Sequence, residues 1–190
     1  DEPAQDRLLG DDLRVVAGVR GGGHGGDQRV QVRRAADARE FALAVEGRGD
    51  ERGEQQFLCR RYPTLLDLFA RGFLPARLRR FFTRRLARYE MRDQINARDI
   101  FWDPPIVSGC FMLFRTSVLK RLGGFDARYF LYFEDYDLSL RAHEVTRVVY
   151  TPSVRVLHHG GGAARKGTAH IRMFMASAYK FFNRFGWKWL

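Results

Sequence analysis

The stretch YFLYFEDYDLSLR, residues 129–141, sets three acidic residues directly behind a run of aromatic ones. Carboxylates beside that much aromatic surface cost free energy unless they face water, a partner or a reaction. The acids also open a predicted helix over residues 134–142, where negative charge in the first turn complements the helix dipole. Taken by itself, the stretch admits both a structural and a catalytic interpretation.

The helical spacing separates the roles of the three acids. Glu134 and Asp135 are neighbours and point about 100° apart, whereas Asp137 shares the face of Glu134. Arg141 lies four residues after Asp137, so the spacing predicts an ion pair between them. One carboxylate is then available as a general base, a role worth ~10² to 10⁴ in rate, while another holds the helix.

Ordinary helix and strand signals surround this stretch from residue 57 onward. Thr64 follows Pro63 as a helix N-cap, and Gly72 is a typical helix stop. The expected elements are a helix over 65–72, a basic amphipathic helix over 76–92, a buried strand within 104–114, a helix over 116–122 stopped by Gly123 and Gly124, two strands joined by a Thr-Pro turn over 147–159, and a helix from 170 onward.

Residues 1–56 differ in composition from the rest of the chain. They contain no Ile, Lys, Ser, Thr, Asn, Tyr, Trp, Met or Cys, and they show no sustained period of 2 or 3.6 residues. We expect this segment to be either an out-of-frame reading of a GC-rich gene or a genuine disordered leader. Translating the upstream DNA in all three frames would distinguish the two hypotheses.

The charge of the chain favours anionic partners. Its 190 residues carry a formal net charge of +11, with a pI of about 10.3. Residues 76–92 and the tail, which ends in Trp187 and Trp189, fit docking on an anionic membrane surface. The alternative for each is a helix packed on its own domain with a solvated basic face. Cys59 and Cys110 have neither disulfide-framework nor metal-motif spacing, which favours a reduced, cytosolic-side protein.

Two weaker features lie on either side of the acidic stretch. VSGC, residues 107–110, places small residues on a strand where a ligand can approach closely. HHGGG, residues 158–162, follows a strand with two candidate metal ligands and with glycines that allow a phosphate near the backbone. Each feature alone is a weak indication of a site.

The order of these segments along the chain indicates a family more specifically than any one segment does. SGCFMLFR (108–115), LGGFDARYFLYFEDYDLSLR (122–141) and VVYTPSVRVLHHGG (148–161) together resemble the C-terminal half of family 2 glycosyltransferases of the rhamnosyltransferase type. The resemblance implies a GT-A fold, an α/β fold with a Rossmann-like, mostly parallel sheet and flanking helices. The N-terminal nucleotide-binding part of that fold is not recognisable here. Residues 57–190 therefore look like the acceptor and catalytic-base half.

The resemblance also implies roles for the acidic stretch. Asp135 matches the general base that deprotonates the acceptor hydroxyl. Glu134 stands beside it in the same catalytic pair, holding the local geometry or contacting the acceptor. Asp137 takes an acceptor-binding or structural role, and Arg141 anchors the helix by pairing with an acid.

Further residues receive roles from the same resemblance. Ser108 and Gly109, on the preceding strand, are expected to be acceptor-binding or structural. His158 matches the histidine that helps to bind a divalent metal, Mg²⁺ or Mn²⁺, on the donor diphosphate, and His159 is the second candidate. No protein nucleophile is needed for inverting transfer, because the acceptor itself attacks.

These observations predict a glycosyltransferase that moves a sugar, such as rhamnose, from a nucleotide-diphosphate donor to a lipid-linked or polysaccharide acceptor. We expect it to act at the inner face of the cell membrane as a peripheral protein. Because the donor half is not recognisable, we expect the chain to be truncated and inactive as given. The alternative is a non-catalytic basic protein that binds anionic membrane or nucleic acid. Known nucleic-acid motifs are absent from the sequence, so nucleic acid is not the expected partner.

Overall fold

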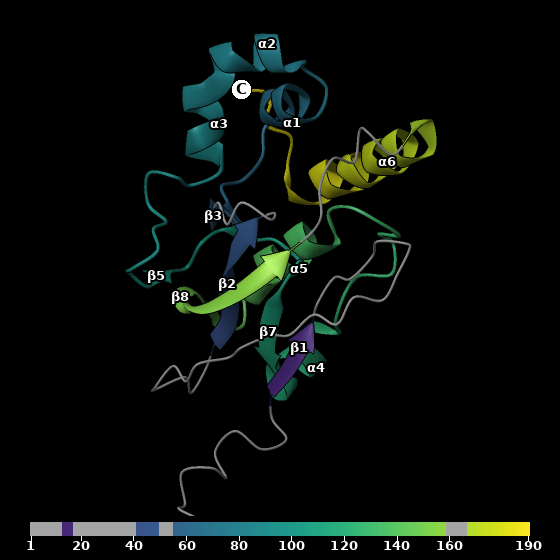
Figure 1. Cartoon of the computed structure of the whole chain (residues 1–190). Helices are drawn as coiled ribbons and strands as arrows, with labels where there is room; N and C mark the ends of the chain where they lie inside the picture. The colour runs from purple at the N-terminus through teal and green to yellow at the C-terminus, as the bar shows by residue number, and fades with distance from the viewer. Residues whose placement is uncertain (1–12, 17–40, 50–54, 159–166) are drawn as a thin grey trace, which may run out of the picture.

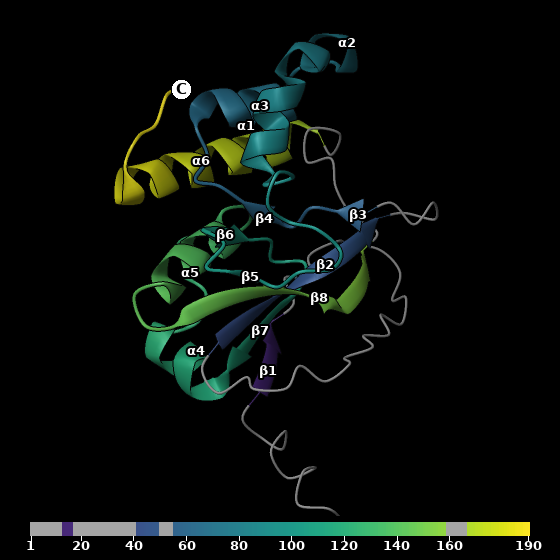
Figure 2. The same cartoon turned by 90° about the vertical axis from the view of Figure 1, so that its left-hand side faces the viewer.

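Four of the helices lie together at one end of the protein, and the main sheet lies toward the other end with two further helices beside it (Figures 1 and 2). The computed structural model describes residues 13–16, 41–49, 55–158 and 167–190, with side chains over 57–152 and 167–190. Helices α1 (Leu65–Gly72), α2 (Ala76–Arg79), α3 (Thr83–Tyr89) and α6 (Thr168–Phe185) lie together at one end. Helices α4 (Thr116–Leu122) and α5 (Glu134–Ala142) pack beside the sheet.

The main sheet is mixed, with the order β1-β7-β2-β8-β5 and β3 paired to β2. A second, two-stranded sheet joins β4 to β6. The strands are β1 (Leu13–Val16), β2 (Phe41–Gly49), β3 (Gln55–Gln56), β4 (Cys59–Arg60), β5 (Phe101–Trp102), β6 (Ile106–Val107), β7 (Met112–Arg115) and β8 (Arg147–His158).

The α/β class is confirmed, but the expected mostly parallel sheet is not shown. Among the described strands only β2 and β8 pair in parallel. Parallel neighbours need a long crossover between them. In chain order β7 is followed by α4, α5 and then β8. In the sheet, however, β8 is not the neighbour of β7, because β2 lies between them. The strand inserted between them, β2, is antiparallel to β7.

Strands β1, β2 and β3 come from the segment of anomalous composition, where we expected no regular structure. The β2 sequence FALAVEGRG is rich in alanine and glycine, which are weak strand formers. Its pairing with β7 and β8 therefore depends on neighbours far away in the sequence. The other residues of 1–56 lie outside the described part, and the origin of the segment stays a prediction.

Helix α1 begins and ends where the sequence predicted. The Thr64 side chain accepts a hydrogen bond from the backbone of Asp67, and the Asp67 carboxylate accepts one from the backbone of Thr64. This capping box satisfies two donors that a helix start leaves without partners. Helix α4 likewise ends at Gly123, whose φ of 72° lies in the left-handed region that glycine adopts without strain.

Two sequence predictions of continuous elements were wrong. The helix expected over 76–92 is interrupted by a 3₁₀ turn, Arg80–Phe82, where the Thr83 hydroxyl donates to the Arg80 carbonyl at 2.7 Å. Such a local side-chain bond competes with the regular helical ladder. The strand expected within 104–114 is two strands, β6 and β7, which belong to different sheets.

The opposite error concerns β8, which is one strand rather than two. Its register against β2 shifts between Val45 and Glu46, which face Thr151 and Arg155 respectively. The extra residues include Pro152, which has no N–H to donate to a neighbouring strand. The proline therefore produces an irregularity within the strand instead of a turn.

Two apolar clusters hold the layers together. One lies against the sheet and contains Cys59, Met91, Ile95, Val107, Met112, Phe114, Leu138, Ala142, Val148 and Tyr150. The other joins α1 and the region before α5 to α6, and contains Leu68, Tyr129, Phe133, Ala178, Phe181 and Phe182. Helix α5 contributes Leu138 to the first cluster, and Phe133, which directly precedes α5, belongs to the second.

The chain after α6 returns to the beginning of α1. The backbone N–H groups of Leu65 and Leu66 donate to the carbonyls of Lys188 (2.9 Å) and Trp189 (3.3 Å). The Tyr62 hydroxyl donates to the Gly186 carbonyl at 2.7 Å. The tail therefore supplies acceptors to the first amides of α1, which have no partners within their own helix.

Candidate active site

The acidic stretch contacts the VSGC segment, residues 107–110, through the side chain of Asp135. The backbone N–H of Gly109, in the turn between β6 and β7, donates to Asp135 Oδ2 at 2.8 Å. The backbone N–H of Tyr136 donates to the other oxygen, Oδ1, at 2.9 Å. The two hydrogen bonds fix the orientation of the carboxylate. The structure thus brings together Gly109 and Asp135, which are 26 residues apart.

Glycine at position 109 leaves the space that this contact needs. A Cβ atom added there would lie 3.0 Å from Asp135 Cβ and 3.4 Å from Asp135 Oδ2. Since Asp135 Cβ is next to the helix backbone, it cannot move aside as a flexible side-chain end would. A side chain at position 109 would therefore require Asp135 to shift by a few tenths of an ångström.

We expect Gly109→Ala to displace the Asp135 carboxylate and to slow any reaction that this carboxylate serves at least about tenfold, because misplacing a reacting group is costly. Gly72→Ala is the control, since a Cβ atom there meets nothing within 4 Å. Rates and melting temperatures of both variants give the measurement. Equal rates for the two variants would show that the contact has no role in the reaction.

The environment of Asp135 changes its acidity. The side chain is partly buried, and desolvation raises the pKa of its carboxyl. The hydrogen bonds from Gly109 and Tyr136 and the positive charge of Arg60 oppose this shift and lower the pKa, but burial is the larger cause. A raised pKa makes the carboxylate a stronger base than an ordinary aspartate, which suits proton abstraction.

The backbone before α5 adopts an uncommon conformation. Tyr132 and Phe133 have φ values of 68° and 65°, both in the left-handed region. This conformation is costly for bulky residues and persists only where packing enforces it. Phe133 provides that packing, because its ring lies 5.2 Å from those of Phe174 and Phe181. The strained pair sets the position at which α5 begins, and therefore where Asp135 lies.

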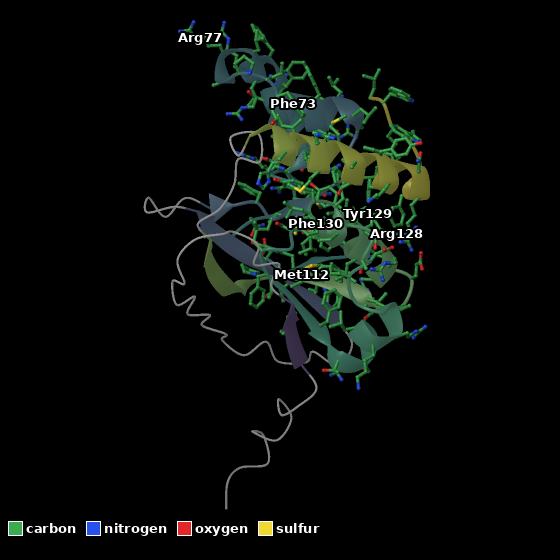
Figure 3. The ribbon with its side chains drawn as sticks, turned by 90° about the vertical axis from the view of Figure 1, so that its right-hand side faces the viewer. Phe73, Arg77, Met112, Arg128, Tyr129 and Phe130 are labelled. Carbon is green, nitrogen blue, oxygen red and sulfur yellow. The ribbon has the colours of Figure 1, made fainter. Side chains whose placement is uncertain are left out.

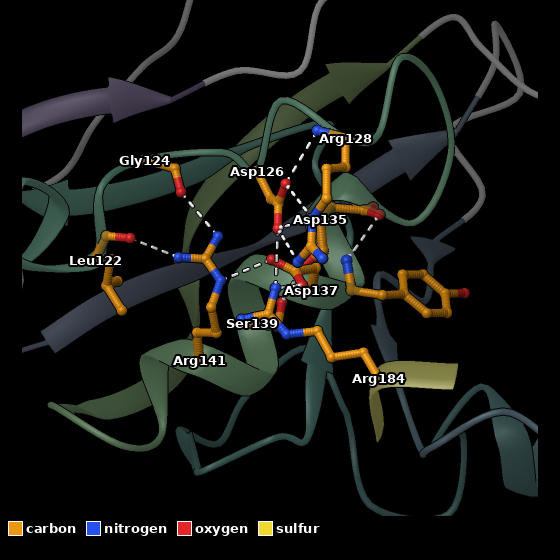
Figure 4. A network of polar contacts seen from close by, with 10 residues as sticks. Leu122, Gly124, Asp126, Arg128, Asp135, Asp137, Ser139, Arg141 and Arg184 are labelled. Carbon is orange, nitrogen blue, oxygen red and sulfur yellow. Dashed lines mark hydrogen bonds and ion pairs between the residues drawn. The ribbon is translucent and has the colours of Figure 1, made fainter. Parts of the chain in front are cut away.

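Asp137 lies at the centre of an ion-pair network (Figure 4). Its side chain is fully buried. Arg141 Nε lies 2.6 Å from Asp137 Oδ2, as the spacing predicted, and Arg184 Nη1 lies 2.7 Å from Oδ1. Arg141 also donates to the carbonyls of Leu122 and Gly124 at 2.6 and 2.8 Å. These contacts tie α5 to the end of α4 and to α6.

The other predicted site residues are Glu134 and Ser108, which lie next to Asp135 and Gly109 in the sequence, and the histidines His158 and His159. Glu134 is partly buried in the first turn of α5, and its charge contributes to the raised pKa of Tyr132, whose main cause is burial. Ser108 lies beside Gly109, and its N–H donates to the Leu58 carbonyl at 2.9 Å. His158 ends β8, where its backbone pairs with Gly49. Its side chain and the whole of His159 lie outside the described part.

The described side chains do not supply a metal site on their own. Within the described residues, no three His, Cys, Asp or Glu side chains converge in a way that could hold a metal ion. The oxygens of Asp135 are both held by backbone N–H groups, and those of Asp137 by arginines.

Two residues near the site were missed by sequence reasoning. Ser139 accepts from the backbone N–H of Val107 at 3.0 Å and donates to the Asp135 carbonyl at 2.7 Å. Its position four residues after Asp135 could have indicated that both face the same strand. Arg184 gave no comparable signal, because it lies 47 residues from its partner Asp137.

Comparison with known proteins supports a glycosyltransferase relationship over part of the chain. No protein-family model matches. The N-acetylglucosaminyl-diphospho-decaprenol L-rhamnosyltransferase of Mycobacterium tuberculosis is 34% identical over 128 residues, covering 65% of this chain and 39% of that protein. Rhamnosyltransferase WbbL of Escherichia coli K12 is 43% identical over 53 residues, covering 27% of this chain and 20% of its own length. The chain thus spans well under half of the rhamnosyltransferases that it matches.

Proposed function

We propose that the protein is an inverting glycosyltransferase of the GT-A type that acts on a lipid-linked acceptor. Both relatives are named rhamnosyltransferases, and the name of one specifies an N-acetylglucosaminyl-diphospho-decaprenol acceptor. We therefore propose L-rhamnose from a nucleotide-diphosphate donor as the transferred sugar, and a polyprenyl-diphosphate saccharide as the acceptor. The described residues form the acceptor and catalytic-base side of this enzyme.

The observation that carries the proposal is the contact between Gly109 and Asp135. The resemblance names Gly109 and Asp135 in two separate motifs, and a 2.8 Å hydrogen bond joins them here. The resulting carboxylate is fixed by two backbone donors and has a raised pKa because of its burial. An acid that only stabilises the first turn of a helix can do so while exposed to water. It does not need a glycine on a neighbouring segment to make room for it.

In the proposed reaction, Asp135 accepts the proton of the acceptor hydroxyl. The acceptor oxygen forms a bond to the anomeric carbon while the bond from that carbon to the diphosphate oxygen breaks. The nucleotide diphosphate leaves with the electron pair, and Asp135 ends the step protonated. Because the attack comes from the face opposite the leaving group, the anomeric configuration inverts.

A divalent cation, Mg²⁺ or Mn²⁺, stays a prediction, with His158 as its expected ligand in this chain. When bound, such an ion would neutralise charge on the leaving diphosphate. The proposed base chemistry of Asp135 does not depend on it.

The test is a transfer assay with nucleotide-activated rhamnose and polyprenyl-diphospho-N-acetylglucosamine. We would assay the chain itself and a chimera in which the N-terminal half of the mycobacterial relative precedes residue 57. We expect an inverted rhamnosyl product from the chimera, and its loss in the Asp135→Asn chimera. A folded chimera that binds both substrates but forms no product would contradict the proposal.

We further propose that the helical end of the protein contacts the inner face of the cell membrane. No described helix is long and apolar enough to span a bilayer. Residues 76–89 contain six arginines and no acid, and Leu78 and Phe81 on this segment are 48% and 72% exposed. Figure 3 shows Phe73 and Arg77 at this end, far from Met112 of the sheet. Exposed apolar side chains among cations suit an anionic lipid surface.

We expect the chain to co-sediment with vesicles rich in anionic phospholipid and not with neutral ones. Replacing Arg79 and Arg80 by glutamine should weaken binding roughly 30-fold, since each cation near the surface contributes about 1 kcal/mol. The control replaces two exposed arginines elsewhere, Arg98 and Arg121, by glutamine. Equal loss in both double variants would indicate attraction by net charge alone, without a defined surface.

A further inference from the structure

Arg184 connects the C-terminal helix to the acidic stretch. From α6 its Nη1 reaches Asp137 Oδ1 at 2.7 Å and Asp126 Oδ2 at 2.9 Å. Asp126 belongs to the turn after α4, and Arg128 also binds it, at 2.6 Å. One guanidinium group therefore bridges the turn, α5 and α6, as Figure 4 shows.

The contacts of α5 divide between two sides of the helix. Asp135 and Ser139 face the β6 side, where they bind the backbone N–H groups of Gly109 and Val107. Asp137 is two residues from each, which corresponds to about 200° around the helix axis. Contacts on opposite sides prevent the helix from rotating about its axis or sliding along it. The hold on Asp137 therefore affects where the Asp135 carboxylate lies.

Arg141 does not replace Arg184 in this role. Its guanidinium is already bound to the Leu122 and Gly124 carbonyls and to only one Asp137 oxygen. Among the described residues, Arg184 is the side chain that donates to Asp137 Oδ1, and without it this oxygen would lose that donor inside a fully buried site. A buried carboxylate with an unsatisfied oxygen moves toward water or another donor, and α5 would move with it.

We propose that Arg184 is a positioning residue for the carboxylate of Asp135. It does not contact Asp135 itself, and it acts by holding α5 through Asp137. The catalytic meaning of this role rests on the proposed function, whereas the mechanical coupling between Arg184 and the Gly109–Asp135 contact does not. The two can therefore be tested separately.

The test of the coupling is amide hydrogen exchange on the full chain. We expect Arg184→Met to speed exchange of the Gly109 amide by about 10-fold or more, since local opening is read directly by exchange. The Phe114 amide, in buried strand β7, should keep its rate. Arg184→Lys should recover part of the protection. Arg128→Met is the matched control, because Arg128 binds Asp126 but not Asp137.

Two exchange results would overturn the inference. In one, the Gly109 amide exchanges at the wild-type rate in Arg184→Met. In the other, the Gly109 and Phe114 amides speed up equally, which would mean a loss of global stability only. In the active chimera, Arg184→Met should lower kcat and leave the donor KM nearly unchanged, with Arg184→Lys intermediate. If the wild-type chimera made no product, the proposed function would fail while the exchange result would still stand.

Discussion

Replacing Asp135 by asparagine is expected to lower turnover by about 10² or more, the magnitude of a lost general base. Asparagine has nearly the same size and can still accept the hydrogen bond from Gly109, but it cannot accept the proton of the acceptor. Donor affinity and melting temperature should change little, because binding and packing are retained. The measurement is kcat and KM of the chimera with and without the substitution.

The pH dependence of the reaction supplies a second check on Asp135. Burial raises the pKa of its carboxyl, so the acid limb of the pH–rate profile should lie above the pKa of an ordinary aspartate. The free energy of unfolding should change in the opposite direction to the rate. The folded state favours the protonated Asp135, so its contribution to stability is present at low pH and is lost as the pH rises through the folded pKa. Glu134→Gln is the control. If it abolished turnover while Asp135→Asn did not, the base would be Glu134.

Replacing Asp137 by asparagine is expected to cost stability before activity. The substitution removes the one carboxylate between Arg141 and Arg184 in a fully buried position. Breaking a buried ion pair in this way costs about 3 kcal/mol or more. For a chain of this size, the melting temperature should fall by roughly 6 to 12 °C.

The matched control for Asp137 is Asp93, whose side chain is 53% exposed and pairs with Arg61 at 2.7 Å. Because exposed pairs contribute about 1 kcal/mol or less, Asp93→Asn should lower the melting temperature by only a few degrees. Thermal unfolding followed by circular dichroism compares the two. Similar shifts would mean that the buried network does not hold α5.

Local chemistry made helices α1, α4 and α5 predictable. The cap at Thr64, the glycines after α4 and the acids of α5 each act within a few residues, and all three helices have the predicted bounds. The strands were less predictable, because a strand needs partners distant in sequence. Strand β2 mixes strand-favouring Phe41 and Val45 with alanines and glycines, and its place between β7 and β8 is set by tertiary pairing.

The sequence predicted most residues of the candidate site but not the contacts between them. The resemblance named Gly109 and Asp135, and spacing predicted the pair of Asp137 with Arg141. Neither indicated that Gly109 donates directly to Asp135, since that contact depends on the turn that divides β6 from β7. Arg184 could not be found from sequence, because a lone arginine on an amphipathic helix looks like any other solvated cation.

The return of the tail to α1 has a consequence for the order in which the protein folds during synthesis. The first amides of α1 take their acceptors from Lys188 and Trp189, which leave the ribosome long after Leu65 does. The sheet and α5 can pack as they emerge, as chains folding from the N-terminus do. Helix α1, in contrast, is translated early but acquires its full set of backbone partners only after α6 and the tail have been made.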